Sequence, residues 1–170
     1  MDIFDDNALV LCDALVDYLP YHSVEGEITW KDCSLRRWLN DDFIKAAFNV
    51  DEMFMLQKSP LFDDPSIADR LFILSKEEIE KYLSGETDKK SDCKLIPART
   101  AAILGGPRGF RGSLAEAPYW WVRNPDYTDP RFGSMIGHID SNGLYGSTPS
   151  YCERWVRPAC WIKMSDLISR

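Results

Sequence analysis

The sequence predicts an α+β fold, because helix patterns dominate its first half and strand patterns its second. Residues 32–48 and 75–84 each place apolar side chains on one helical face. From Pro118 onward, short runs of aromatic and β-branched residues alternate with turn residues. The 170 residues suit one domain with a sizeable core, so we expect a single domain over residues 1–170.

The first signals along the chain are those of a strand and a long helix. Residues 8–11 are a short apolar run, which suits a buried strand. Asp32 or Ser34 can cap the helix that follows. Its apolar stripe predicts that Arg36 and Arg37 face away from the core.

Two capping boxes predict two further helices. Asn49 opens an Asn-x-x-Glu sequence ahead of a short helix over residues 50–57. Ser75 opens a Ser-x-x-Glu sequence ahead of the second main helix. Between them, residues 71–74 are an apolar run that predicts a buried strand.

The second half of the chain has the pattern of short strands joined by turns. Ser-Asn-Gly at residues 141–143, between two apolar runs, predicts a β-hairpin. Further strands are expected at 119–123, 155–157 and 159–162. The glycine-rich stretch 105–112 carries two arginines but lacks the Gly-Lys-Ser/Thr end of a phosphate-binding loop, so it is interpreted as a plain loop.

Composition and charge argue against several classes of function. The formal net charge of −7 argues against nucleic acid as a partner. No apolar run reaches the roughly 18–20 residues of a membrane span, and the acidic N-terminus lacks the features of a signal peptide, so we expect a cytoplasmic protein and no membrane contact. The five cysteines form no Cys-x-x-Cys pair and the two histidines are far apart, so we expect no metal and no cofactor.

One set of residues, His138, Asp140 and Cys152, fits nucleophilic catalysis. His138 and Asp140 alternate along an expected strand and so face the same way. Nothing in the sequence brings Cys152 to them, and such sets arise by chance in many domains. We therefore expect a protein that is not an enzyme, and keep this set as the catalytic alternative.

Residues 124–154 have an unusual composition, with three Tyr, four Ser, four Gly and no Lys. Tyr with Ser and Gly is typical of adaptable binding surfaces, and Lys is depleted at the centres of interfaces. The same residues also occur in ordinary loops between strands, because turns need Gly and Ser. Composition alone does not separate these two interpretations.

Two blocks of the sequence resemble a bacterial and phage family of uncharacterised domains. The first is Trp-Lys-Asp-Cys-Ser-Leu-Arg-Arg-Trp-Leu-Asn-Asp-Asp-Phe at residues 30–43. The second is Trp-Trp-Val-Arg-Asn-Pro at 120–125, completed by Val-Arg-Pro-Ala-Cys-Trp-Ile at 156–162. With the apolar run at 71–74 and the helix after it, these blocks cover most of the chain.

The resemblance implies a C-type-lectin-like fold, with two main helices packed on a small twisted antiparallel sheet and long C-terminal loops. Some members are similar to the variable proteins of diversity-generating retroelements, in which error-prone reverse transcription rewrites chosen codons near the C-terminus. By that resemblance, residues 124–154 are the variable or binding region. The Glu-Pro-Asn and Trp-Asn-Asp motifs of calcium-dependent lectins are absent, so sugar binding is not implied.

These observations predict a rigid frame that displays a binding surface. Arg123 and Arg157 are expected to order loops through hydrogen bonds to backbone carbonyls. Four tryptophans are assigned to the core or its rim, namely Trp30, Trp38, Trp121 and Trp161.

We expect a non-catalytic domain that binds a protein or other macromolecular ligand, alone or as part of a phage particle or larger assembly. The alternative is a purely structural module of such an assembly. The expected ligand-binding residues are Tyr127, Asp129, Arg131, Phe132, Ser134, His138, Ser141, Tyr145, Ser147, Tyr151, Glu153 and Arg154.

Overall fold

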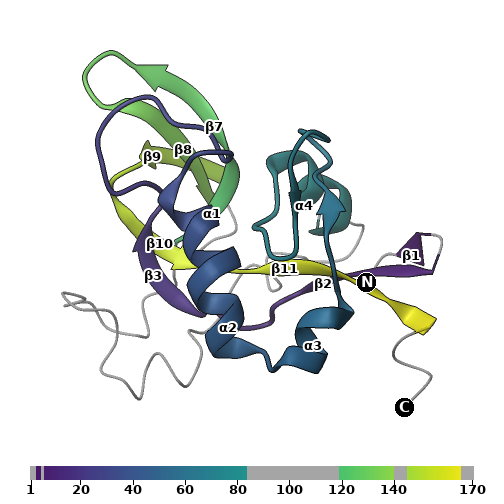
Figure 1. The fold of residues 1–170 in the computed structure, drawn as a ribbon. Helices are drawn as coiled ribbons and strands as arrows, with labels where there is room; N and C mark the ends of the chain where they lie inside the picture. Colours follow the sequence, from purple (N-terminus) through teal and green to yellow (C-terminus); the bar gives the residue numbers. More distant parts are fainter. Residues whose placement is uncertain (1–2, 5, 84–118, 140–144, 166–170) are drawn as a thin grey trace.

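The computed structural model describes residues 3–4, 6–83, 119–139 and 145–165. In this part, short helices pack among three β-sheets, which confirms the α+β class (Figure 1). In these residues strands contribute more than helices, and three strands of the sheets come before the first helix. The glycine-rich stretch 105–112 and the turn at 141–143 lie outside the described residues.

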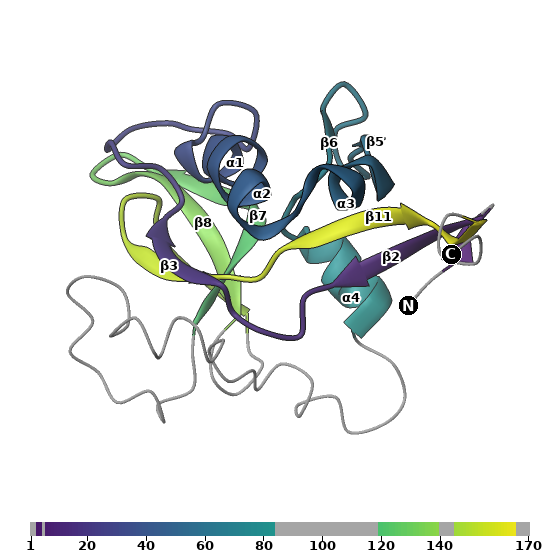
Figure 2. The same cartoon turned by 60° about the horizontal axis from the view of Figure 1, so that its bottom comes forward.

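A four-stranded sheet brings together segments from both ends of the described chain. Its strand order is β1-β2-β11-β4, with bounds Ile3–Phe4, Asn7–Leu11, Ala159–Lys163 and Leu56–Gln57. β2 and β11 pair antiparallel and lie side by side in Figure 2. Ala8 and Leu9 of β2 are buried, so the strand expected at residues 8–11 is confirmed.

A five-stranded sheet carries most of the region expected to bind a ligand. Its order is β3-β10-β7-β8-β9, with bounds Asp17–Pro20, Glu153–Val156, Trp120–Asp129, Gly133–Ile139 and Tyr145–Pro149. β7, β8 and β9 form an antiparallel meander, so the strand pairing expected on either side of residues 141–143 is confirmed. A small third sheet joins β5 (Ser59–Pro60) to β6 (Ala68–Asp69).

The helix expected over residues 32–48 is present, but it is not a regular α-helix. It runs through α1 (Ser34–Trp38), the π-helical turn η1 (Leu39–Phe43) and α2 (Ile44–Ala47). The expected caps were wrong, because the Cys33 Sγ accepts the N-terminal hydrogen bond, 3.4 Å from the Arg36 amide nitrogen. Arg36 does not point away from the protein, since its guanidinium pairs with the buried carboxylate of Asp69.

Both expected capping boxes are confirmed. Asn49 and Glu52 bond reciprocally ahead of α3 (Val50–Met55), and Ser75 and Glu78 do so ahead of α4 (Lys76–Leu83). Residues 71–74 are buried as predicted but form no strand of their own. Their only β-pairing in the described residues is the isolated bridge from Phe72 to Ala159.

The tryptophan assignments are confirmed. Trp30 and Trp121 are buried, and Trp38 and Trp161 are half-buried against the core. The ring of Tyr21 lies between the first two, with its centroid 6.0 Å from that of Trp30 and 5.8 Å from that of Trp121. This aromatic contact joins the loop after β3 to the centre of the five-stranded sheet.

Asn40 ties the interrupted helix to the buried segment 71–74. Its Nδ2 donates to the carbonyls of Arg36 and Leu71 at 3.1 and 2.8 Å. Its Oδ1 accepts from the amides of Arg70 and Leu71 at 3.2 and 3.1 Å. The side chain therefore uses its full hydrogen-bonding capacity on backbone groups.

We predict that Asn40→Ala lowers the free energy of unfolding by about 2 kcal/mol, because the backbone groups of the buried Leu71 lose their partners. Urea denaturation measures the change. Asp41→Ala, at the exposed neighbouring position, is the matched control and should leave stability nearly unchanged. Equal losses for the two variants would contradict the assigned role of Asn40.

Candidate functional site

The expected ligand-binding residues separate into two groups on the five-stranded sheet. Tyr127, Asp129, Arg131, Phe132 and Ser134 lie at the free end of the β7–β8 hairpin, with Tyr151 in the turn before β10. The second group lies farther along the sheet and comprises His138, Tyr145, Ser147, Glu153 and Arg154. Ser141, like Asp140, lies outside the described residues.

Ser134 organises the hairpin end and is not part of the exposed surface. It is buried, and its Oγ accepts from the Ile28 amide at 2.8 Å and donates to the Ile28 carbonyl at 3.1 Å. Its amide donates to Gly26 O, and its carbonyl accepts from the Ser150 amide, both at 3.0 Å. One residue thus clamps the loop after β3 and the turn before β10 to the hairpin.

Gly133 makes this clamp sterically feasible. Its φ of +72° lies in the left-handed region, which favours glycine. A Cβ at this position would overlap the backbone of Gly26, which pairs with Gly133 in a parallel β-bridge. In Figure 1 the segment leading from β3 to α1 accordingly runs beside the β7–β8 hairpin.

The clamp gathers exposed apolar side chains at one end of the sheet. Val24 is 63% exposed, Tyr127 51%, Tyr151 37% and Phe132 36%. Arg131 adds a charge, with its guanidinium 5.0 Å from the Phe132 ring centroid and 3.1 Å from an Asp129 carboxylate oxygen. We call Val24, Tyr127, Arg131, Phe132 and Tyr151 the hairpin-end surface.

Asp129 shapes the tip of the hairpin through Arg131. Its Oδ1 accepts from the Arg131 amide at 2.8 Å and from the Arg131 Nε at 3.2 Å. Hydrogen bonds from the Arg131 side chain and amide hold the pKa of the Asp129 carboxyl below its usual value. Asp129 therefore stays charged at neutral pH and orients Arg131 along the tip.

His138 is buried in a second, packed cluster. Its ring lies edge-on to that of Tyr119 at 5.3 Å, and a Cβ on Gly146 would come within 3.0 Å of its Nε2. Arg154 lies over the same Tyr119 ring at 5.3 Å and donates to Thr148 Oγ1 at 3.2 Å. The arrangement packs these side chains against one another, so His138 is not an exposed ligand contact.

Tyr145 is half-buried on β9, the edge strand of this sheet. The Lys76 ammonium lies 4.5 Å from its ring centroid. Burial, followed by the carboxylates of Asp126, Glu77 and Glu80, raises the pKa of the Tyr145 hydroxyl to about 12. The hydroxyl therefore stays protonated at neutral pH.

The cysteines differ in their surroundings. Burial raises the pKa of the Cys33 thiol to about 12 and that of the Cys160 thiol to about 11, so both stay protonated at neutral pH. Cys152 is half-buried in the turn before β10, where its amide donates to Pro149 O at 3.0 Å. In the catalytic alternative, only Cys152 and His138 are described, and Asp140 is not.

A buried arginine supports the sheet from which the hairpin extends. Arg123 has no exposed surface; its Nη1 donates to Ile73 O at 2.9 Å, and its Nη2 pairs with Glu78 at 2.9 Å and with Asp63. Its carbonyl accepts from the Tyr21 hydroxyl at 2.5 Å. Burial raises the pKa of Glu78, and the charge of Arg123 opposes that shift.

The predicted role of the two arginines is confirmed. Arg123 bonds to the Ile73 carbonyl, and Arg157 Nε donates to the Cys12 carbonyl at 2.9 Å. The sequence did not reveal the carboxylates around Arg123. Glu78 was expected only as the second member of a capping box, and Asp63 lies in a surface loop with no local motif.

The model of one family, described as Domain of unknown function (DUF6273), matches residues 5–164. The chain belongs to the DUF6273 family. No curated protein and no solved structure matches it. The match spans the hairpin-end surface and the Arg123 cluster alike, so the DUF6273 domain includes both.

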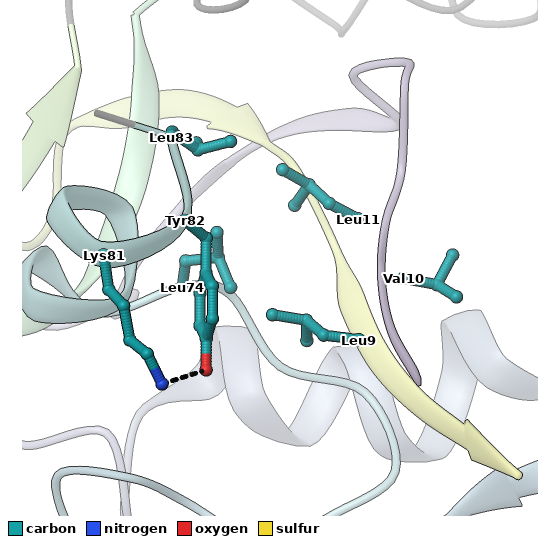
Figure 3. Close-up of a pocket in the computed structure, with 7 residues that line it drawn as sticks. All are labelled: Leu9, Val10, Leu11, Leu74, Lys81, Tyr82 and Leu83. Atoms are coloured by element: carbon teal, nitrogen blue, oxygen red, sulfur yellow. Dashed lines mark hydrogen bonds between the residues drawn. The ribbon is translucent and has the colours of Figure 1, made fainter. Parts of the chain in front are cut away.

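The DUF6273 domain also has a cavity of about 460 Å³ between β2 and the end of α4. Figure 3 shows Leu9 and Leu11 pointing toward Tyr82 and Leu83, while Val10 lies on the other side of the strand. Lys81 Nζ donates to the Tyr82 hydroxyl at 3.1 Å. Five of the seven lining residues are aliphatic, and Lys81 and Tyr82 supply the polar side-chain groups.

The described part of the DUF6273 domain shows neither a metal centre nor a membrane span. Among these residues, no three His, Cys, Asp or Glu side chains gather closely enough to hold a metal ion. No helix in the same residues is long and apolar enough to cross a membrane.

We predict that Arg123→Met lowers the free energy of unfolding by about 3–5 kcal/mol, because Glu78 and Asp63 lose the buried cation that pairs with them. Arg131→Met is the matched control; its side chain is 76% exposed, and its loss should not measurably change stability. Thermal and urea denaturation compare the two variants. A similar, small effect for both would contradict the importance of the buried cluster.

Ser134→Ala should loosen the loop after β3 without unfolding the sheet. The Ile28 amide loses its acceptor, and we expect a loss of about 1–3 kcal/mol in unfolding free energy. Hydrogen exchange at the Ile28 amide should become faster. Thr128→Ala, on the exposed residue paired with Ser134, is the control and should leave that exchange rate unchanged.

Proposed function

We propose that this domain is a non-catalytic, C-type-lectin-like binding module whose hairpin-end surface recognises a protein or other macromolecular ligand. One observation carries the proposal: Val24, Tyr127, Phe132 and Tyr151 are exposed together on segments held by the Ser134 clamp. Clustered exposed apolar side chains are typical of interaction sites.

The chemistry of the surface supports recognition of a macromolecule. Tyrosine and phenylalanine provide large contact areas with few rotatable bonds, so ordering them on binding costs little entropy. Arg131 provides a charged group that can select the partner. The hydrogen bonds of Ser134 fix the backbone beneath these side chains, so binding a ligand costs little further conformational entropy.

We propose further that the exposed positions of residues 124–154 are those diversified by a retroelement. Among the described residues, this limits the variable positions to those whose side chains reach solvent, such as Tyr127, Arg131 and Tyr151. Ser134 and His138, which are buried, would stay constant. A nearby reverse transcriptase gene and a near-copy of the coding segment, differing where the copy has adenine, would support this; variation spread evenly over buried positions would contradict it.

A peptide-display experiment tests the binding surface directly, because a random library offers the domain ligands of many chemical kinds. Peptides selected from such a library against the domain should bind with dissociation constants in the micromolar range. The triple variant Tyr127→Ser, Phe132→Ser, Tyr151→Ser should weaken that binding at least tenfold, because it removes the aromatic contacts.

The matched control changes two apolar side chains that are exposed elsewhere. Val50 is 62% exposed and Phe54 75% exposed, both on α3. Val50→Ser with Phe54→Ser should leave peptide binding unchanged. An equal loss of peptide affinity in both variants, or no loss in the triple variant, would contradict a binding site at the hairpin end.

A further inference from the structure

A cavity of about 300 Å³ lies beside the interrupted helix, away from the hairpin end. Four cationic and two acidic residues line it, together with two uncharged ones; the charged residues are Arg36, Arg37, Lys58, Arg70, Asp41 and Asp69. Four positive and two negative charges give a net charge of +2, in a chain whose formal net charge is −7. Positive charge is therefore concentrated here against the overall charge of the protein.

One of the two carboxylates in the cavity is already neutralised. Asp69 is buried, and its oxygens accept from Arg36 Nε and Nη2 at 2.8–3.0 Å and from Trp30 Nε1 at 2.9 Å. Arg36 Nη1 also donates to Lys31 O at 2.7 Å. The Arg36 guanidinium is thus fixed in place and its charge is balanced by Asp69.

The other three cationic side chains of the cavity are not paired with a described carboxylate in this way. In the residues that the structure describes, Arg37, Lys58 and Arg70 form no ion pair. The Arg37 side chain donates only to a backbone carbonyl, that of Asp32, at 2.9 Å. Asp41 is the one remaining carboxylate on the wall, so the three cations retain excess positive charge that an anion between them would offset.

The wall of the cavity is built on the π-helical turn η1. The Ile44 amide bonds to Leu39 O across this turn, in place of the regular α-helical partner. Such turns are rare and often occur at functional sites. Asn40, within the turn, makes three of its four hydrogen bonds to the backbone of residues 70 and 71 and so holds the backbone of Arg70 beside the turn that carries Asp41.

We propose that this cavity binds a doubly charged oxyanion, either free phosphate or the phosphate group of a small phosphorylated molecule. Arginine is well suited to this role, because its planar guanidinium can donate two hydrogen bonds to one phosphate. The volume is at the lower end of the range for small-molecule sites, which leaves room for a phosphate and a small attached group. The proposal is independent of the hairpin-end surface.

Phosphate titration of the ¹⁵N-labelled full chain, followed by NMR at constant ionic strength with chloride as the balancing anion, tests the site. Saturable shifts should concentrate at residues 36–44, 58 and 69–70. Arg37→Gln with Arg70→Gln should weaken binding at least tenfold. Lys45→Gln with Lys163→Gln removes the same charge from exposed positions outside the cavity and should change affinity less than twofold.

Phenyl phosphate, titrated in parallel, distinguishes the two sources of the oxyanion. Tighter binding than inorganic phosphate assigns the site to a phosphorylated molecule, and equal binding assigns it to the free ion. Non-saturable shifts, shifts spread over the surface, or equal weakening in both double variants would overturn the proposal. The spectra of the variants also show whether each remains folded.

Discussion

The rest of the structure depends on how the buried charge of Arg123 is satisfied. Removing a guanidinium from water is costly unless its charge is paired and most of its donors are hydrogen-bonded. Ile73, Glu78 and Asp63 supply partners for the charge and for Nη1 and Nη2 from separate segments, and Tyr21 bonds to the carbonyl of the same residue. The segment before α4, α4 itself and the loop after β3 are therefore fixed relative to β7.

This constraint explains why β7 and β8 can display side chains at their free end. The sheet is anchored at Arg123, and the hairpin extends beyond that anchor to Gly133. Ser134 is also a buried polar residue that needs hydrogen-bond partners. The backbone of Ile28, in the loop after β3, supplies them, and the same bonds hold that loop against the hairpin. The exposed aromatic residues are supported by two successive sets of buried hydrogen bonds.

The sequence predicted the features that have local causes. The capping boxes at Asn49 and Ser75 and the pairing of the strands on either side of residues 141–143 depend on neighbouring residues, and each was predicted from local residue types and their spacing. Partners that are distant along the chain, such as Asp69 for Arg36, leave no local pattern. The Cys33 cap escaped prediction because a thiol is a weak hydrogen-bond acceptor.

The burial of β8 shows why the site was predicted only in part. Alternation along a strand predicts one exposed face, yet the residues from 134 to 139 are all buried, so both faces of β8 are covered. Ser134 and His138 therefore could not be separated from exposed neighbours such as Phe132 by pattern.

The π-helical turn raises a related point about packing. Leu39 and Ile44 lie too far apart to share one face of a regular α-helix at about 100° per residue. The wider turn lets both be buried while Asn40 and Asp41 remain beside the cationic cavity. The same irregular turn therefore both buries two core side chains and forms part of the wall of the cavity.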